Sequence, residues 1–155
     1  MKLAYKFSST SFLTVDDKSR LLIPADVRRK LDPTADTDVF VIKIGSNGKP
    51  WMWPERYYDA KVFDQDQSLN EDDIDPTPEQ LERMLSRSAD IYRVPMDKQG
   101  RILLPDLVLE LTHTGREVAL LGVFNHLQLW NRDEFAQRQK GKQLGSTSGT
   151  ANDGT

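Results

Sequence analysis

Short apolar runs separated by polar turns recur along the whole chain, and this pattern predicts a fold built mainly from short β-strands. Residues 11–15 and 20–23 are β-rich runs around a four-residue polar link, which predicts a β-hairpin. Residues 39–44 read as a buried strand, and a turn rich in Gly, Ser and Asn separates them from a return strand at 51–53. The first sixty residues are therefore expected to be rich in sheet.

Proline residues indicate where helices begin. Pro24 suits the first turn of a helix that extends to Leu31, because its missing N–H costs nothing there. Pro54 opens a second short helix, and the segment Thr77-Pro78-Glu79-Gln80 has the form of an N-cap followed by a capping box. A final helix is expected from about Arg132.

The chain repeats itself. The segment DDKSRLLIP at 16–24 returns 81 positions later as DKQGRILLP at 97–105. The strands at 39–44 and 51–53 correspond to the runs at 118–123 and 127–130. We therefore expect two units of the order strand-turn-strand-helix-strand-strand-helix, with function in the polar turn of each unit.

Composition divides the chain into four segments. A first repeat spans 7–63, an acidic linker 64–78, a second repeat with its preceding helix 79–140, and a tail 141–155 that we expect to be disordered because Gly, Ser, Thr, Asn and Gln dominate it. Half of a 155-residue chain is marginal as an independent domain, so the two halves are expected to share one core.

Several classes of function are excluded by composition. The absence of cysteine excludes a disulfide framework, a thiolate metal site and a cysteine nucleophile, and two isolated histidines leave little for a zinc site. No phosphate-binding glycine loop or nucleophile motif is present, so we predict neither an enzyme, a cofactor nor a small-molecule substrate. The chain has no signal-peptide core and no membrane span, which predicts a cytoplasmic protein without membrane partners.

Charge is unevenly distributed. Seven acidic and no basic residues lie between Asp64 and Glu79, and without them the net charge of −3 becomes +4. The first repeat is the most basic part of the chain through Lys18, Arg20, Arg28, Arg29 and Lys30. The electrostatic surface is therefore expected to be local and asymmetric between the halves.

The repeated turns are the candidate binding site. Asp16 and Arg20 share their spacing with Asp97 and Arg101, so each carboxylate is placed to hold its arginine in a fixed orientation. A fixed guanidinium donates bidentately to a phosphate or to guanine O6 and N7, and neighbouring lysines reach phosphates. The alternative is a pair of ordinary polar hairpin turns, each with a weak surface ion pair.

Other candidates have simpler explanations. Trp51 and Trp53 share one face of a strand and favour the core or a subunit interface over base stacking. Arg28 and Arg29, with Lys30, extend the basic surface or form a solvated helix face.

The remaining titratable candidates carry no predicted chemistry. His113 and His126 occupy turn contexts and are predicted to be surface residues rather than ligands. Asp72 and Asp73 lie in an acidic run and are not predicted to be an acid–base pair.

The paired D-x-x-x-R turns, each followed by an apolar strand and proline, and the pattern V-x-L-x-G-V-x-x-x-L-x-L-W at 118–130, resemble the MraZ family. The resemblance covers roughly residues 7–135 and places the chain in the AbrB-like (SpoVT/AbrB) group of bacterial DNA-binding proteins. It implies a mixed β/α fold, mainly β, in which two AbrB-like units form one pseudo-dimeric barrel of the double-psi or swapped-hairpin type.

The same resemblance implies a function. It implies a cytoplasmic, nucleoid-associated transcriptional regulator of its own operon in the division and cell-wall gene cluster, which assembles into homo-oligomeric rings and binds short direct repeats in promoter double-stranded DNA. The DNA-binding residues carried over are Asp16, Lys18, Arg20, Asp97, Lys98 and Arg101, with Arg28 and Arg29 as further candidates.

Two features leave other interpretations open. Ser19 stands where the family has the glycine of K-G-R, and Ser9 replaces another glycine, so the first turn is expected to differ in geometry. The neutral second half also fits an alternative function, in which the chain is an oligomeric scaffold that binds protein partners without specific DNA binding.

Overall fold

The computed structural model describes residues 6–31, 39–63 and 74–153, with side chains as far as Lys142. The first half contains β1 (Thr10–Thr14), β2 (Arg20–Leu22), α1 (Ala25–Arg28), β3 (Val39–Ile44), β4 (Pro50–Pro54), α2 (Glu55–Tyr57) and the π-helix η1 (Tyr58–Phe63). The second half contains α3 (Pro78–Met84), the π-helix η2 (Leu85–Ala89), β5 (Tyr92–Pro95), β6 (Arg101–Leu103), α4 (Asp106–Thr112), β7 (Glu117–Val123), β8 (His126–Asn131) and α5 (Arg132–Asp153).

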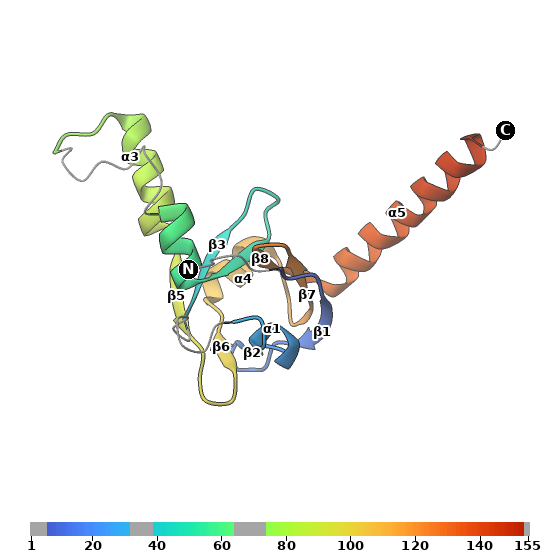
Figure 1. Cartoon of the computed structure of the whole chain (residues 1–155), viewed down its shortest axis with the longest axis horizontal. Helices are drawn as coiled ribbons and strands as arrows, with labels where there is room; N and C mark the ends of the chain where they lie inside the picture. Colours follow the sequence, from blue (N-terminus) through green and yellow to red (C-terminus); the bar gives the residue numbers. More distant parts are fainter. Residues whose placement is uncertain (1–5, 32–38, 64–73, 154–155) are drawn as a thin grey trace.

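The strands form one large antiparallel sheet and one small ribbon. The sheet has the order β1-β7-β8-β4-β3-β5, and β2 pairs with β6 in a separate two-stranded ribbon. In Figure 1 the ribbon and α1 lie at the bottom of the molecule, opposite the β3–β4 hairpin at the top, while α5 projects away from the sheet. The fold is therefore mixed α/β, with antiparallel β-structure as its scaffold.

The predicted hairpin between residues 11–15 and 20–23 is wrong. Strand β1 pairs with β7 along five residue pairs from Thr10↔Leu121 to Thr14↔Glu117, whereas β2 pairs with β6. In the second half β5 likewise pairs with β3 rather than with β6. Each half therefore contributes its first strand to the other half's sheet, a pairing that local sequence does not specify.

The ribbon is centred on a buried pair. Leu21 lies opposite Ile102 in the antiparallel register, and both side chains are almost completely buried. Two backbone hydrogen bonds of 2.8 Å flank the pair, from Ile23 N–H to Gly100 and from Leu104 N–H to Ser19. The buried side chains of both strands join one core with the sheet, so the prediction of a single shared core agrees with the packing.

The expected barrel does not close within the described residues. Strands β1 and β5 are the edges of the large sheet, and the ribbon has only three paired residues in each strand. Pro24 and Pro105 follow soon after β2 and β6 and lack the N–H that a longer ladder needs. The prediction of a closed barrel is therefore wrong for the described residues, which form an open sheet and a separate ribbon.

Helix starts follow the sequence closely. Thr77 accepts a hydrogen bond from the N–H of Gln80, whose side chain accepts from the N–H of Thr77, so the predicted capping box is present. Helices α1, α2 and α4 each begin directly after a proline. Helix α5 continues to Asp153 and thus runs through much of the tail for which composition predicts disorder. Asp72 and Asp73 lie outside the described residues.

The tryptophans belong to a second apolar cluster. Trp53 is buried with Val41 and Tyr58, and Trp51 packs against this cluster, so the core interpretation of the two indoles is confirmed. Among the helices in the described residues, none combines the length and the apolar composition that crossing a bilayer requires.

Candidate nucleic-acid interface

The first turn is organised around the carboxylate of Asp16. Its Oδ1 accepts hydrogen bonds from the N–H of Lys18 at 2.9 Å and the N–H of Arg20 at 2.8 Å. Its Oδ2 accepts from Nε of Arg20 at 2.7 Å. One carboxylate therefore fixes both the backbone of the turn and the orientation of the guanidinium.

The second turn has the same arrangement. Oδ1 of Asp97 accepts from the N–H groups of Gln99 and Arg101, each at 2.9 Å, and its Oδ2 accepts from Nε of Arg101 at 3.0 Å. Gln99 occupies the position of Lys18, so Lys98 lies one residue earlier than the lysine of the first turn. The predicted Asp–Arg pairing is confirmed as geometry in both copies.

Electrostatics keep both carboxylates ionised. The backbone N–H of Arg20 is the main cause that lowers the pKa of Asp16 below its usual value, and the Arg20 side chain acts in the same direction. The N–H and side chain of Arg101 lower the pKa of Asp97 in the same way. Both arginine side chains remain about one-third exposed, so each is accessible to solvent.

Ser19 does not give the first turn a different geometry, contrary to expectation. Its φ of 62° lies in the left-handed region, as does the φ of 85° at Gly100 in the second turn. The strain that a serine meets there is offset by a 2.7 Å hydrogen bond from its Oγ to Asp106 on α4. The two turns therefore share one backbone form despite the substitution.

The guanidinium of Arg28, one of the predicted DNA-binding residues, lies close to Gly100 in the second turn. A Cβ at this position would lie 2.9 Å from a terminal nitrogen of Arg28 and 3.0 Å from its guanidinium carbon. The guanidinium of Arg28, from the first half, thus covers the turn of the second half. Sequence reasoning missed this contact because Arg28 and Gly100 are far apart along the chain.

The other predicted cations are exposed around the turns. Lys18, Lys98 and Arg29 all have exposed side chains, and within the described residues none of them forms a salt bridge. The ribbon separates the two turns, since Arg20 and Arg101 start opposite strands of a three-residue ladder. At roughly 3.4 Å per residue, the two arginines are about 7 Å apart along the ribbon.

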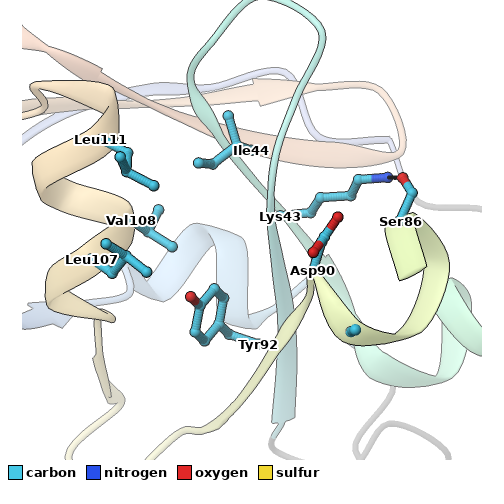
Figure 2. A pocket seen from close by; sticks show the side chains of 9 residues that line it. Lys43, Ile44, Ser86, Asp90, Tyr92, Leu107, Val108 and Leu111 are labelled. Carbon is cyan, nitrogen blue, oxygen red and sulfur yellow. Dashed lines mark hydrogen bonds between the residues drawn. The ribbon is translucent and has the colours of Figure 1, made fainter. Parts of the chain in front are cut away.

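A cavity of about 410 Å³ lies elsewhere, between α4, β3 and the end of η2. Figure 2 shows Lys43 donating a hydrogen bond to Ser86, with Leu107, Val108 and Leu111 on the opposite side of the space. Burial is the main cause that lowers the pKa of Lys43. None of the predicted DNA-binding residues lines this cavity, which is therefore separate from the turns.

His126 is buried, so the prediction that it is a surface residue is wrong. Its ring stacks on Trp51 with centroids 4.2 Å apart and is within hydrogen-bond distance of Asn125 and Gln128. Burial lowers its pKa. His113 is exposed as predicted, and within the described residues no three His, Asp or Glu side chains are grouped for metal binding.

The fold and the two turns define a mixed α/β protein with an antiparallel β-scaffold, in which two equivalent Asp–Arg turns are partly exposed to solvent. The family model described as "MraZ protein, putative antitoxin-like" matches residues 89–153. Three similar proteins, each named Transcriptional regulator MraZ, come from Chromobacterium violaceum, Neisseria meningitidis and Chlorobaculum parvum.

These relatives match over most of their length. The Chromobacterium violaceum protein is 33% identical over 128 residues, which cover 81% of this chain and 80% of the relative. The Neisseria meningitidis protein is 32% identical over 83% and 82% of the two chains, and the Chlorobaculum parvum protein is 30% identical over 90% and 87%. The chain belongs to the MraZ family. The names of the relatives are those of regulators, which confirms the prediction that the protein is not an enzyme.

Proposed function

We propose that the protein is a DNA-binding transcriptional regulator that contacts promoter DNA through its two D-x-x-x-R turns. The observation that carries the proposal is the identical hydrogen-bonding of Asp16 with Arg20 and of Asp97 with Arg101. The bonds from these arginines to their aspartates use Nε, which leaves terminal nitrogens for a planar acceptor, although one terminal nitrogen of Arg101 also donates to Oε1 of Gln99 at 3.5 Å. The regulator names of the relatives point to the same function.

Each residue of the interface has a distinct role in this proposal. Arg20 and Arg101 donate to guanine edges or phosphates, while Asp16 and Asp97 position them without touching DNA. Lys18, Lys98, Arg28 and Arg29 add phosphate contacts, which give affinity without sequence preference.

The proposal includes a pseudo-dimer and a ring. The exchange of β1 and β5 between the halves supports a pseudo-dimeric unit with one turn at each end of its ribbon. Several chains in a homo-oligomeric ring raise the effective concentration of turns, and rotation between neighbours suits direct repeats better than a palindrome. In this proposal the protein acts in the cytoplasm on nucleoid DNA, at the promoter of its own division and cell-wall operon.

Fluorescence anisotropy with the protein's own upstream DNA and with scrambled DNA tests the proposal across a salt series. The Arg20→Ala/Arg101→Ala variant is expected to lose the preference for upstream DNA and to show a smaller salt slope, by about 0.9 log units for each phosphate that is no longer neutralised. The matched control is Arg138→Ala/Lys140→Ala, which removes two positive charges from exposed positions of α5. The control is expected to retain the preference.

Sedimentation velocity of the same samples measures assembly. A closed ring predicts one discrete oligomer whose size does not change in either variant. Equal binding of both DNAs that is unchanged by Arg20→Ala/Arg101→Ala overturns the regulator proposal and favours the protein-interaction scaffold.

A further inference from the structure

The outer face of the β2–β6 ribbon carries leucines as well as arginines. Leu21 and Ile102 face the core, so the alternating neighbours Arg20, Leu22, Arg101 and Leu103 lie on the opposite face. Leu22 is 49% exposed and Leu103 is 58% exposed. These two leucines are 81 positions apart, like the arginines of the two turns.

Each leucine is paired with an arginine of the other strand. Leu103 lies directly opposite Arg20, and Leu22 directly opposite Arg101, in the antiparallel register. Opposite residues on one face have Cβ atoms about 4.5–5.5 Å apart, so each leucine side chain stands beside a fixed guanidinium. The face is thus two copies of one unit, an oriented arginine with an apolar neighbour.

The charge around this face favours DNA as its occupant. Lys18, Lys98 and Arg28 border the ribbon, and the two acids closest to the arginines, Asp16 and Asp97, are already paired with them. Other acids near the turns are Asp17, which is exposed, Asp106, which accepts from Ser19, and Glu110, which lines a small pocket together with Asp16 and Ser19. A two-stranded ribbon fits the major groove, where the thymine methyl is the apolar feature among hydrogen-bonding edges.

We propose that Leu22 and Leu103 are specificity-determining residues that contact thymine C5-methyl groups beside the bases contacted by Arg101 and Arg20. This proposal rests on the DNA-binding function proposed above and adds the chemistry that the arginines lack. An arginine selects guanine, whereas an exposed leucine selects the methyl group by excluding water from it.

The test replaces thymine by uracil throughout the protein's own upstream DNA, which removes only the methyl groups. Burying one methyl group is worth about a fourfold change in affinity, so two contacts predict about a 15-fold loss for the unmodified protein. Leu22→Ala/Leu103→Ala is expected to bind thymine and uracil DNA equally, while Leu22→Met/Leu103→Met retains the discrimination.

The control variant is Leu107→Ala/Leu111→Ala, which makes the same change at two leucines of α4 that are 51% and 58% exposed. It is expected to keep the full thymine–uracil ratio. Unfolding midpoints are measured for every variant, and the expected values are unchanged because all four leucines are exposed.

The outcomes separate the two proposals. Preference for upstream over scrambled DNA, with no response to uracil, overturns the role of the leucines and leaves the regulator function standing. A thymine–uracil ratio that survives Leu22→Ala/Leu103→Ala also overturns it. No preference for upstream DNA in the unmodified protein overturns both proposals.

Discussion

Ser19 in the first turn donates a 2.7 Å hydrogen bond to Asp106 in the second half, and this bond accompanies a left-handed backbone at the serine. The contact joins a turn of one half to the first residue of a helix in the other, 87 positions away. It explains how a side chain replaces the glycine of the matching turn without changing the turn.

Substitutions at Ser19 separate the hydrogen bond from the backbone strain. Ser19→Gly removes the bond and also the strain, each about 1 kcal/mol, so the free energy of unfolding is expected to change little. Ser19→Ala removes the bond and keeps the strain, so a loss of about 1 kcal/mol is expected. Urea unfolding at neutral pH measures both, and an alanine variant as stable as the glycine variant contradicts the interpretation.

Gly100→Ala tests the contact between the second turn and Arg28. The new Cβ meets a guanidinium at 2.9 Å and a φ of 85°, so a loss of about 1–2 kcal/mol and a displaced Arg28 are expected. Gly48→Ala is the matched control, because its φ is 78° and nothing lies within 4 Å of the added atom. Both variants are expected to lose similar stability, measured by thermal unfolding, but only Gly100→Ala weakens DNA binding.

Leu21→Ala tests the buried centre of the ribbon. Its side chain has no exposed surface, so truncation is expected to cost about 2–5 kcal/mol of unfolding free energy. The adjacent Leu22→Ala removes the same atoms from an exposed position and is expected to cost less than about 0.5 kcal/mol. Equal midpoints for the two variants in urea are incompatible with the register described for the ribbon.

The buried His126 predicts a specific pH dependence of stability. Burial lowers its pKa in the folded state, so above the usual value of 6.5 both states hold the neutral ring and pH has no effect through this group. Below 6.5 the unfolded state takes up the proton first as the pH decreases. The free energy of unfolding is therefore expected to decrease as the pH is lowered from 6.5. Urea unfolding between about pH 7.5 and 5 at roughly half-unit steps is expected to show this slope, and His126→Gln to reduce it.

The matched control for this slope is His113→Asn, which removes the exposed histidine and keeps a residue that tolerates its left-handed backbone. A slope that persists unchanged in His126→Gln assigns the pH dependence to other groups.

Local features of the fold are predictable because local sequence determines them. The strand Val39–Ile44 has the bounds that the sequence predicts, and the capping box at Thr77 is present in full. The Asp–Arg pairing within each turn also follows from spacing alone, since four residues across a tight turn bring both side chains together.

The wrong predictions for β1, the first turn and His126 concern long-range partners. Residues 11–15 and 20–23 read as a hairpin, but the partner of β1 is β7, and no local signal distinguishes the two pairings. His126 is buried because Trp51 from the other half stacks on it. The first turn keeps its geometry because Asp106 is nearby in space. One clue to His126 is present in the alternation of His126, Gln128 and Trp130 along one strand.

The pairing of β1 with β7 also bears on how the chain folds during its synthesis. Thr14 lies opposite Glu117, 103 positions later, so β1 leaves the ribosome long before its partner exists. At usual elongation rates the delay is about 5 to 20 s, which is long compared with strand pairing. Strands β1 and β2 therefore remain without their native partners until β7 and β6 have been synthesised. Each sequence repeat therefore depends on strands of the other repeat to complete its sheet, and the folding unit is the pair of repeats.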